Sequence, residues 1–175
     1  MYRRCVPLNL KITLWDGYQM DKINVKKKQV LQRKGSLQSK GYIVESGLLR
    51  SYTIDGNGKE HIFMFGPEGW IVTDYAAADE PCDLYIDALE DSVVIQIEKN
   101  SELEIDLKKI MKRMRVLQRR IVMLMSESAI DRYNHFILTY PTIVQRVPQY
   151  MIASYLGITP EALSAAKSQR LKPRK

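Results

Sequence analysis

Hydrogen-bonding and basic side chains recur close together near the end of the chain, between Gln149 and Arg170. Hydroxyl, amide and carboxylate groups can bond to base edges or phosphates, and lysine and arginine neutralise phosphates. Glu161 could accept from a cytosine amino group, whereas Lys167 and Arg170 suit phosphates. This chemistry predicts contact with double-stranded DNA through Gln149, Thr159, Glu161, Ser164, Lys167, Ser168 and Arg170.

The stretch QYMIASYLGITPEALSAAKS, residues 149–168, has the pattern of a helix-turn-helix that would hold these side chains. Gly157 supplies the turn, because glycine adopts positive φ without a Cβ penalty. Thr159 would cap the second helix and Pro160 would open it. A helical hairpin inside a core is the alternative. The apolar positions expected to face a shared core, with small Ala153 at the close approach, are Ile152, Leu156, Ile158 and Leu163.

The length and composition of the chain are sufficient for a buried hydrophobic core. It has 175 residues, 45% of them hydrophobic, which is enough for one domain and a smaller one. Cys5 and Cys82 form neither a disulfide framework nor a zinc pattern, which fits a reducing cytoplasm. The sequence has neither a run of about 20 apolar residues nor a signal peptide. We expect a soluble, cytoplasmic protein without a membrane partner.

Charge divides the chain into two unequal halves. Residues 1–100 carry 13 basic and 14 acidic side chains, a net charge of −1. Residues 101–175 carry 14 and 6, a net charge of +8. A basic surface attracts nucleic acid through counterion release. A solvated basic face is the preferred interpretation of the cluster at 108–120, whereas the basic tail next to residues 149–168 favours phosphate contact.

The first hundred residues predict short β-strands. Apolar and β-branched runs at 41–54 and 59–65 flank the turn signal Asp55-Gly56-Asn57-Gly58. A second turn signal lies at 66–69, and further strands are expected at 25–32, 84–89 and 92–97. Short strands with regular turns indicate a sandwich or jelly roll. A short helix with apolar residues spaced between Leu10 and Tyr18 would pack on its outside.

From Glu102 onward the apolar period becomes that of a heptad helix, with Asn100 or Ser101 as its cap. Such a helix would be about 35 Å long at ~1.5 Å per residue, so a second copy of the chain is the economical cover for its stripe. Packing of the stripe against the chain's own β domain is the alternative. The seam expected to form a homodimer is Leu103, Leu107, Ile110, Met114, Leu117, Ile121 and Leu124.

The order of these parts resembles the Crp/Fnr superfamily of bacterial transcription regulators. The segments that carry the resemblance are GYIVESGLLRSY, GKEHIFMFGPEGWIVTDY, ALEDSVVIQIEK and QRVPQYMIASYLGITPEALS. It implies an α+β chain: a cyclic-nucleotide-binding-like β jelly roll at 1–100, a long dimerisation helix at 101–127, and a helical helix-turn-helix domain at 128–175 without a C-terminal wing. It also implies a cytoplasmic, bacterial regulator that binds DNA, with RNA polymerase as a further candidate partner.

The sequence departs from the family in the cyclic-nucleotide cassette. Members that bind cyclic nucleotides carry a Gly-Glu pair for the ribose and an Arg-Ser or Arg-Thr pair for the phosphate, where this chain has Thr73-Asp74 and Cys82-Asp83. Loss of the guanidinium predicts that cyclic AMP is not the ligand, although Arg50 or Lys40 could substitute. Another effector, or none, remains open. Aromatic residues near the cassette are either candidate ligand platforms or core residues. The expected effector pocket consists of Trp70, Thr73, Asp74, Cys82, Asp83 and Tyr85.

The second helix departs as well, because Ala165 stands where family members carry an arginine that reads guanine. A bidentate arginine-guanine contact contributes about 1–3 kcal/mol of discrimination. The alternative function is therefore a ligand-binding or protein-interaction module that has lost specific DNA readout. Catalysis is not expected. His61 and His135 lack metal-ligand spacing, and no phosphate loop or nucleophile motif is present.

Overall fold

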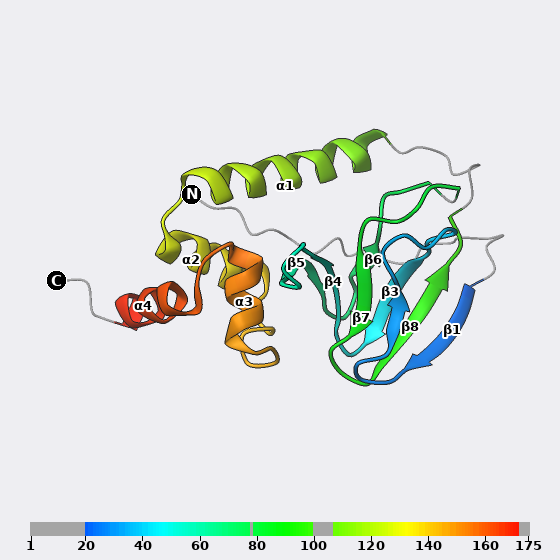
Figure 1. The fold of residues 1–175 in the computed structure, drawn as a ribbon, viewed down its shortest axis with the longest axis horizontal. Helices are drawn as coiled ribbons and strands as arrows, with labels where there is room; N and C mark the ends of the chain where they lie inside the picture. The colour runs from blue at the N-terminus through cyan, green and yellow to red at the C-terminus, as the bar shows by residue number, and fades with distance from the viewer. Residues whose placement is uncertain (1–19, 78, 100–106, 172–175) are drawn as a thin grey trace. The chain divides into compact units, whose positions relative to one another are not determined.

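A computed structural model describes residues 20–77, 79–99 and 107–171. The chain divides into two compact units, with the boundary between Glu102 and Leu103. All described strands belong to the first unit and all described helices to the second (Figure 1). The expected helix around residues 10–18, seam residue Leu103 and the tail 172–175 lie outside the described residues.

The first unit is built from two four-stranded antiparallel sheets (Figure 1). One sheet has the order β1-β8-β3-β6 and the other β2-β7-β4-β5. This arrangement is the jelly-roll-like sandwich that the sequence predicts. The strands are β1 Met20–Val25, β2 Val30–Gln32, β3 Gly41–Ser46, β4 Leu49–Ile54, β5 Glu60–Gly66, β6 Ile71–Thr73, β7 Tyr85–Ala88 and β8 Ser92–Ile97.

Two turns divide stretches that the apolar pattern alone leaves continuous. The run 41–54 becomes β3 and β4 at Gly47, whose φ is +91°. A Cβ there would lie 2.3 Å from Ser92 Oγ, so only glycine fits. The run 25–32 is broken at Lys28, which also has positive φ. The chain therefore changes sheet at both turns.

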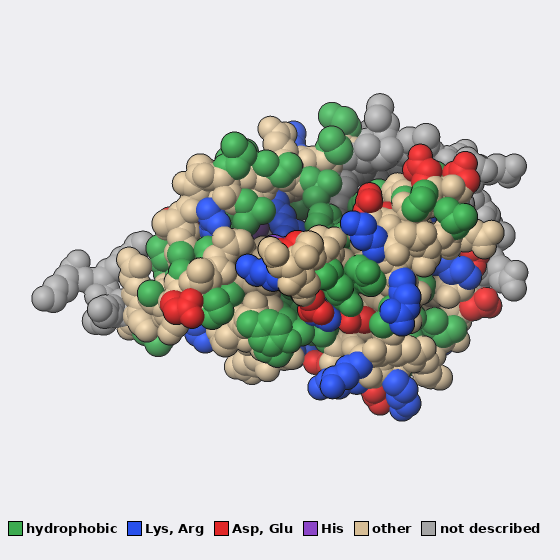
Figure 2. All heavy atoms as spheres, in the orientation of Figure 1, with side chains coloured by type: hydrophobic (Ala, Val, Ile, Leu, Met, Phe, Trp, Pro, Cys, Tyr) green, Lys and Arg blue, Asp and Glu red, His purple; other side chains and the backbone are tan. Residues whose placement is uncertain are grey.

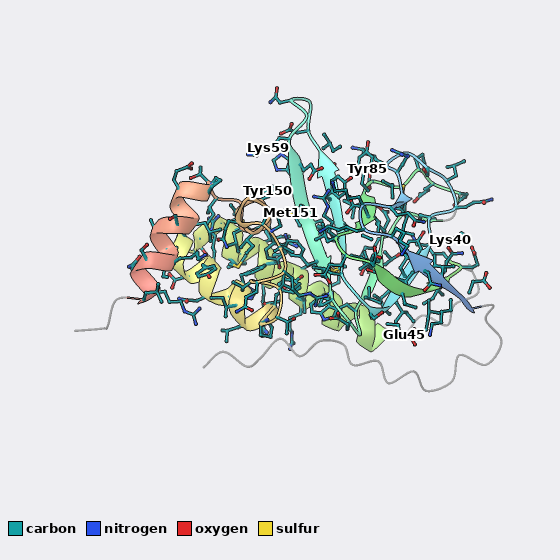
Figure 3. The ribbon with its side chains drawn as sticks, turned by 90° about the horizontal axis from the view of Figure 1, so that it is seen from below. Lys40, Glu45, Lys59, Tyr85, Tyr150 and Met151 are labelled. Carbon is teal, nitrogen blue, oxygen red and sulfur yellow. The ribbon has the colours of Figure 1, made fainter. Side chains whose placement is uncertain are left out.

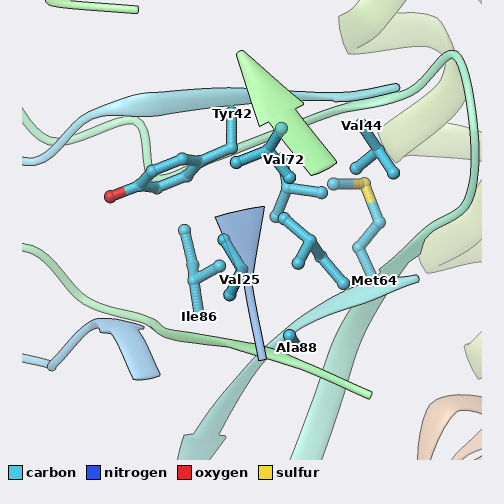
Figure 4. Close-up of a cluster of buried hydrophobic side chains, with 9 residues drawn as sticks. Val25, Tyr42, Val44, Met64, Val72, Ile86 and Ala88 are labelled. Atoms are coloured by element: carbon cyan, nitrogen blue, oxygen red, sulfur yellow. The ribbon is translucent and has the colours of Figure 1, made fainter. Parts of the chain in front are cut away.

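The core of this unit lies between the sheets (Figure 4). Its buried side chains include Val25, Tyr42, Val44, Met64, Val72 and Ile86, drawn from strands of both sheets. Trp70 is partly buried and packs against the same cluster. Burial raises the pKa of Tyr42 to about 12, with a further contribution from Glu98. Its hydroxyl therefore stays protonated at neutral pH and donates to the Leu31 carbonyl.

The second unit contains helices α1 Leu107–Ser126, α2 Ala129–Thr139, α3 Gln149–Leu156 and α4 Pro160–Leu171. Ser128 caps α2, and its hydroxyl accepts from the Asp131 amide. The core of α2 and α3 contains an aromatic cluster in which Phe136, Tyr140 and Tyr155 lie 5.3 to 5.5 Å apart between ring centroids. Among the described helices, none is long and apolar enough to cross a bilayer.

Candidate nucleic-acid interface and effector pocket

The turn between α3 and α4 forms as its sequence predicts. Gly157 has φ 63° and ψ 35°, and its N–H donates to the carbonyls at the end of α3. The Thr159 hydroxyl accepts from the Ala162 amide at 3.2 Å, and Pro160 begins α4. Ile152 and Leu163 are fully buried. The turn glycine, the cap and the proline-led helix are therefore confirmed.

The outer face of α4 carries the polar side chains expected there. Glu161, Ser164, Ser168 and Arg170 are exposed, as is Thr159 just before the helix. On the inner face, Leu163 and Ala166 are 1% and 3% exposed. Ala165, at the position of the family's arginine, is also exposed. Glu161, Ser164 and Ser168 thus form one hydroxyl and carboxylate surface. Arg170, four residues after buried Ala166, is exposed at the C-terminal end of the helix instead.

Lys167 joins α4 to the first residue of α3. Its ammonium donates to Gln149 Oε1 at 3.0 Å. Gln149 is exposed, and next to it Tyr150 is 56% exposed whereas Met151 is buried (Figure 3). A positive charge is thereby held beside the N-terminus of α3, where backbone amides also favour an anion. Two predicted DNA-contact residues are brought together by this bond.

Glu161 lies in the first turn of α4. Hydrogen bonds from its own amide and from the Thr159 hydroxyl hold the pKa of this carboxyl below its usual value. The side chain is therefore an ionised acceptor at neutral pH. An ionised acceptor on this face suits an amino group on a base edge better than a phosphate.

The loop between β6 and β7 contains most of the expected cassette. The buried side chain of Asp74 holds the two ends of this loop together. Asp74 is 3% exposed. Its carboxylate accepts from the amides of Ala76, Asp83 and Leu84 at 2.8 to 2.9 Å. Four lone-pair directions on a carboxylate are thus largely occupied by backbone donors. Asp74 holds the loop together, which leaves little capacity for a ribose hydroxyl.

Lys99 fixes the same loop from the end of β8, and the sequence reasoning missed it. Its ammonium donates to the Asp74 and Ala76 carbonyls and to the Ser39 hydroxyl, so all three donors are used. Burial lowers the pKa of Lys99, while the negative charge of Asp74 opposes that shift. A lysine directly after a strand is indistinguishable in sequence from an exposed one, so the pattern held no signal for this contact.

The other expected pocket residues do not converge on one site. Cys82 is buried, and its thiol lies 2.9 Å from the Arg33 carbonyl. Tyr85 stacks on Tyr52, at 5.3 Å between centroids. Thr73 bonds to the Lys40 and Asp74 carbonyls. An open depression of about 610 Å³ beside the loop is lined by Asp74 and Asp83 together with Phe63, Tyr75, Ala76, Glu80, Pro81 and Leu84.

Arg50 and Lys40, the two cations that could substitute for the missing arginine of the cassette, are both engaged with carboxylates and not available to a phosphate. Arg50 is 6% exposed and makes a bidentate pair with Asp87 at 2.8 and 2.9 Å, and it also binds Glu60. Lys40 pairs with Glu98 at 2.7 Å. Around the depression, carboxylates outnumber cations. An anionic ligand would therefore meet an unfavourable field there.

Helix α1 carries an exposed apolar face. In a helix of 3.6 residues per turn, the exposed apolar residues fall within about a third of the circumference. Figure 2 shows hydrophobic side chains along the upper edge, where Figure 1 draws α1. Met123, by contrast, is 2% exposed. The residues of this apolar face are Met111, Met114, Ile121, Val122 and Met125, between 53% and 80% exposed.

Two of the expected seam residues, Met114 and Ile121, belong to the apolar face. Leu117 and Leu124 are only partly exposed. Leu124 Cδ2 lies 3.6 Å from where a Cβ of Gly157 would be, so it contacts the α3–α4 turn of its own chain. For Leu107 and Ile110 only the helical backbone is described.

Part of the sequence matches a known domain family, and the fold is similar to that of solved structures. Residues 22–106 match the cyclic nucleotide-binding domain family. No curated protein sequence is detectably similar to the chain. The structure of FixK2 from Bradyrhizobium japonicum superposes with a TM-score of 0.71 at 19% identity, covering 86% of this chain and 84% of that one.

Two proteins that are described as regulators have the same fold. TTHA1359 from Thermus thermophilus, a transcriptional regulator of the CRP/FNR family, gives a TM-score of 0.62 at 14% identity, over 85% of this chain and 84% of that one. The c-di-GMP responsive global regulator CLP of Xanthomonas campestris gives 0.61 at 14%, over 90% and 91%. The predicted resemblance is thus confirmed for the fold: residues 22–106 match a cyclic nucleotide-binding domain, and the chain has the fold of FixK2 and of the CRP/FNR-family regulator TTHA1359.

Proposed function

We propose that this protein is a homodimeric DNA-binding transcription regulator of the Crp/Fnr type. The observation that carries the proposal is the α3–turn–α4 unit, with Leu163 buried on one side of α4, a polar surface on the other, and the basic side chains of Lys167 and Arg170 beside it. In this function residues 1–100 act as the sensor or scaffold domain, 101–127 as the dimerisation helix, and 128–175 as the DNA-binding domain.

In the proposed complex, α4 enters the major groove. Glu161 and Ser164 lie in its N-terminal half and would reach base edges, as would Thr159 from the turn. Ser168 would bond to a base edge or a phosphate. Lys167, held by Gln149, and Arg170 would contact phosphates. Pairing of two chains through α1 would set two α4 helices one helical turn of DNA apart.

Selection from genomic fragments tests this function. The full chain is incubated with fragments at near-physiological salt, and the enriched fragments are titrated at several salt concentrations. We expect a two-fold symmetric site with half-sites about 34–36 Å apart, bound roughly 10³-fold or more tightly than random DNA. Binding without an enriched sequence would contradict specific regulation.

Replacement of Lys167 and Arg170 by alanine should flatten the salt dependence of DNA binding. Each phosphate contact contributes about 0.9 to the slope of log K against log salt, so two contacts per chain predict a decrease of about 4 per dimer. The measurement is fluorescence titration across a salt series. The control removes the same charge from the first unit, by Lys34→Ala with Lys59→Ala, both on exposed residues. If both double variants lowered the salt slope equally, the net charge of the protein would account for the effect, and contacts of Lys167 and Arg170 with phosphates would not.

We propose that cyclic AMP is not an effector of this protein. The Asp74 carboxylate is occupied by three backbone amides, and Arg50 is committed to Asp87 and Glu60. Loss of a charged hydrogen-bond partner costs roughly 1.5–3 kcal/mol before repulsion is counted. Calorimetric titration with cyclic AMP should therefore give a Kd weaker than about 1 mM. A micromolar Kd would show that the loop rearranges to admit the nucleotide.

A ligand-binding or protein-interaction module is the second candidate function, and Ala165 favours it. With a methyl group on the exposed face at this position, α4 lacks the side chain that would discriminate guanine by about 1–3 kcal/mol. In that case the protein binds DNA only through charge, and the fragment selection described above separates the two functions.

A further inference from the structure

Helix α1 is attached to the α3–α4 turn at three points, and one arginine makes most of the bonds. Arg132, in the first turn of α2, donates from Nη2 to the Leu124 carbonyl at 2.7 Å and from Nε to the Glu127 carbonyl at 3.0 Å. It also donates from Nη1 to the Leu156 carbonyl at 3.1 Å and to the Gly157 carbonyl at 3.5 Å. One guanidinium thus bridges the end of α1 and the end of α3.

The acceptors of Arg132 are groups that would otherwise lack partners. The last carbonyls of a helix have no intrahelical donor, and together they form the negative end of its dipole. α1 ends at Ser126 and α3 at Leu156, so the guanidinium caps both ends at once. Lysine would not replace it, because the bonds of Arg132 come from three nitrogens of one planar group, whereas all the donors of an ammonium lie on a single atom.

Two further contacts hold α1 against the same place. Arg120, on α1, has its guanidinium carbon 4.1 Å from the ring centroid of Tyr155 on α3. Tyr155 is itself packed in the aromatic cluster with Phe136 and Tyr140. Leu124 approaches the Gly157 turn, as described above. An added methyl at Gly157 would therefore touch both Leu124 and Arg132, at 3.6 and 3.7 Å.

We propose that Arg132 is the positioning residue that fixes the angle between α1 and the α3–α4 unit, and thereby the spacing of half-sites that a dimer accepts. The inference about half-site spacing rests on the proposed function, whereas the inference about the fixed angle between the helices does not. A one-base-pair change in spacing moves the second half-site along the helix axis and rotates it about that axis. A rigid junction therefore discriminates between spacings, whereas a loose one tolerates several.

The fixed angle is tested without DNA by distance measurements between spin labels. Exposed Arg115 on α1, outside the apolar face, and Gln169 on α4 are replaced by labelled cysteines, with Cys5→Ser and buried Cys82 retained. Labelled chains are diluted with unlabelled ones so that only distances within one chain are recorded. We expect one narrow distribution in the parent chain and a broad one in R132Q. Arg119→Gln, an equal change of charge on exposed α1, should leave it narrow.

The consequence for DNA is tested with duplexes in which the spacing of the selected half-sites is varied. We expect the parent to prefer one spacing by about tenfold and R132Q by less than about threefold, with affinity for a single half-site unchanged. R132K should behave like R132Q, and it serves as the second variant if R132Q does not fold. A purely structural role would lower single half-site affinity as well.

The outcomes separate the two ideas. An unchanged, narrow distance distribution in both R132Q and R132K would overturn the role of Arg132, as would an unchanged spacing preference. A broadened distribution in a protein that selects no DNA sequence supports the fixed angle and contradicts the regulator function instead.

Discussion

Replacement of Ile121 by glutamate should convert a dimer into a monomer and weaken binding to a complete two-half-site operator by about 10²–10⁴-fold, because the two heads lose their effective concentration for each other. Ile121 is 58% exposed and belongs to the apolar face of α1. Two glutamates facing each other across a helix pair would bury uncompensated charge. Light scattering gives the mass, and titration of intact and single half-site duplexes gives the loss.

The matched control is Arg119→Gln, which changes the net charge by the same amount from an exposed position outside the apolar face. It should leave both the mass and the operator affinity within about threefold of the parent, as is usual for surface changes. Affinity of I121E for a single half-site should stay near that of the parent. A monomeric I121E that retained full affinity for the intact operator would show that pairing through α1 plays no part in DNA binding.

The sequence predicts local conformations well where one residue type has one physical reason to be present. Gly157, Thr159 and Pro160 have the conformations that their chemistry requires, because turn, cap and first helical turn depend on neighbours in the chain. Strand β8 has the predicted limits, Ser92 and Ile97. The apolar run 41–54, however, contains two strands from different sheets, and only the close packing of Gly47 against Ser92 distinguishes them.

Contacts between residues distant in sequence were not predictable from a single chain. Lys99 and Asp74 close the β6–β7 loop across 25 positions, and Arg132 caps a helix end 24 positions away. A heptad pattern likewise indicates which residues avoid water but not what covers them. Leu124 fits the seam, yet it contacts the turn beside it, while Met111 and Met125, outside the predicted seam, are exposed on the apolar face.

Replacement of Arg50 by methionine should destabilise the first unit by about 3–5 kcal/mol, because it leaves a buried carboxylate without its cation. The Arg50 and Asp87 side chains are 8% and 10% exposed and are joined by two parallel hydrogen bonds. Burial alone would lower the pKa of Arg50, but hydrogen bonds and the charges of Asp87 and Glu60 raise it above its usual value. The guanidinium also lies over the Tyr52 ring at 4.1 Å.

Urea unfolding followed by tryptophan fluorescence measures this cost, since Trp70 packs against the core of the first unit. The control is Glu60→Gln, whose side chain is 37% exposed, and it should cost about 1 kcal/mol or less because solvent screens that pair. The double variant Arg50→Met with Asp87→Leu should recover much of the loss, because a buried ion pair replaced by apolar residues of similar volume is often neutral. A double variant as unstable as R50M would mean that stacking on Tyr52, and not the unpaired charge of Asp87, accounts for the contribution of Arg50.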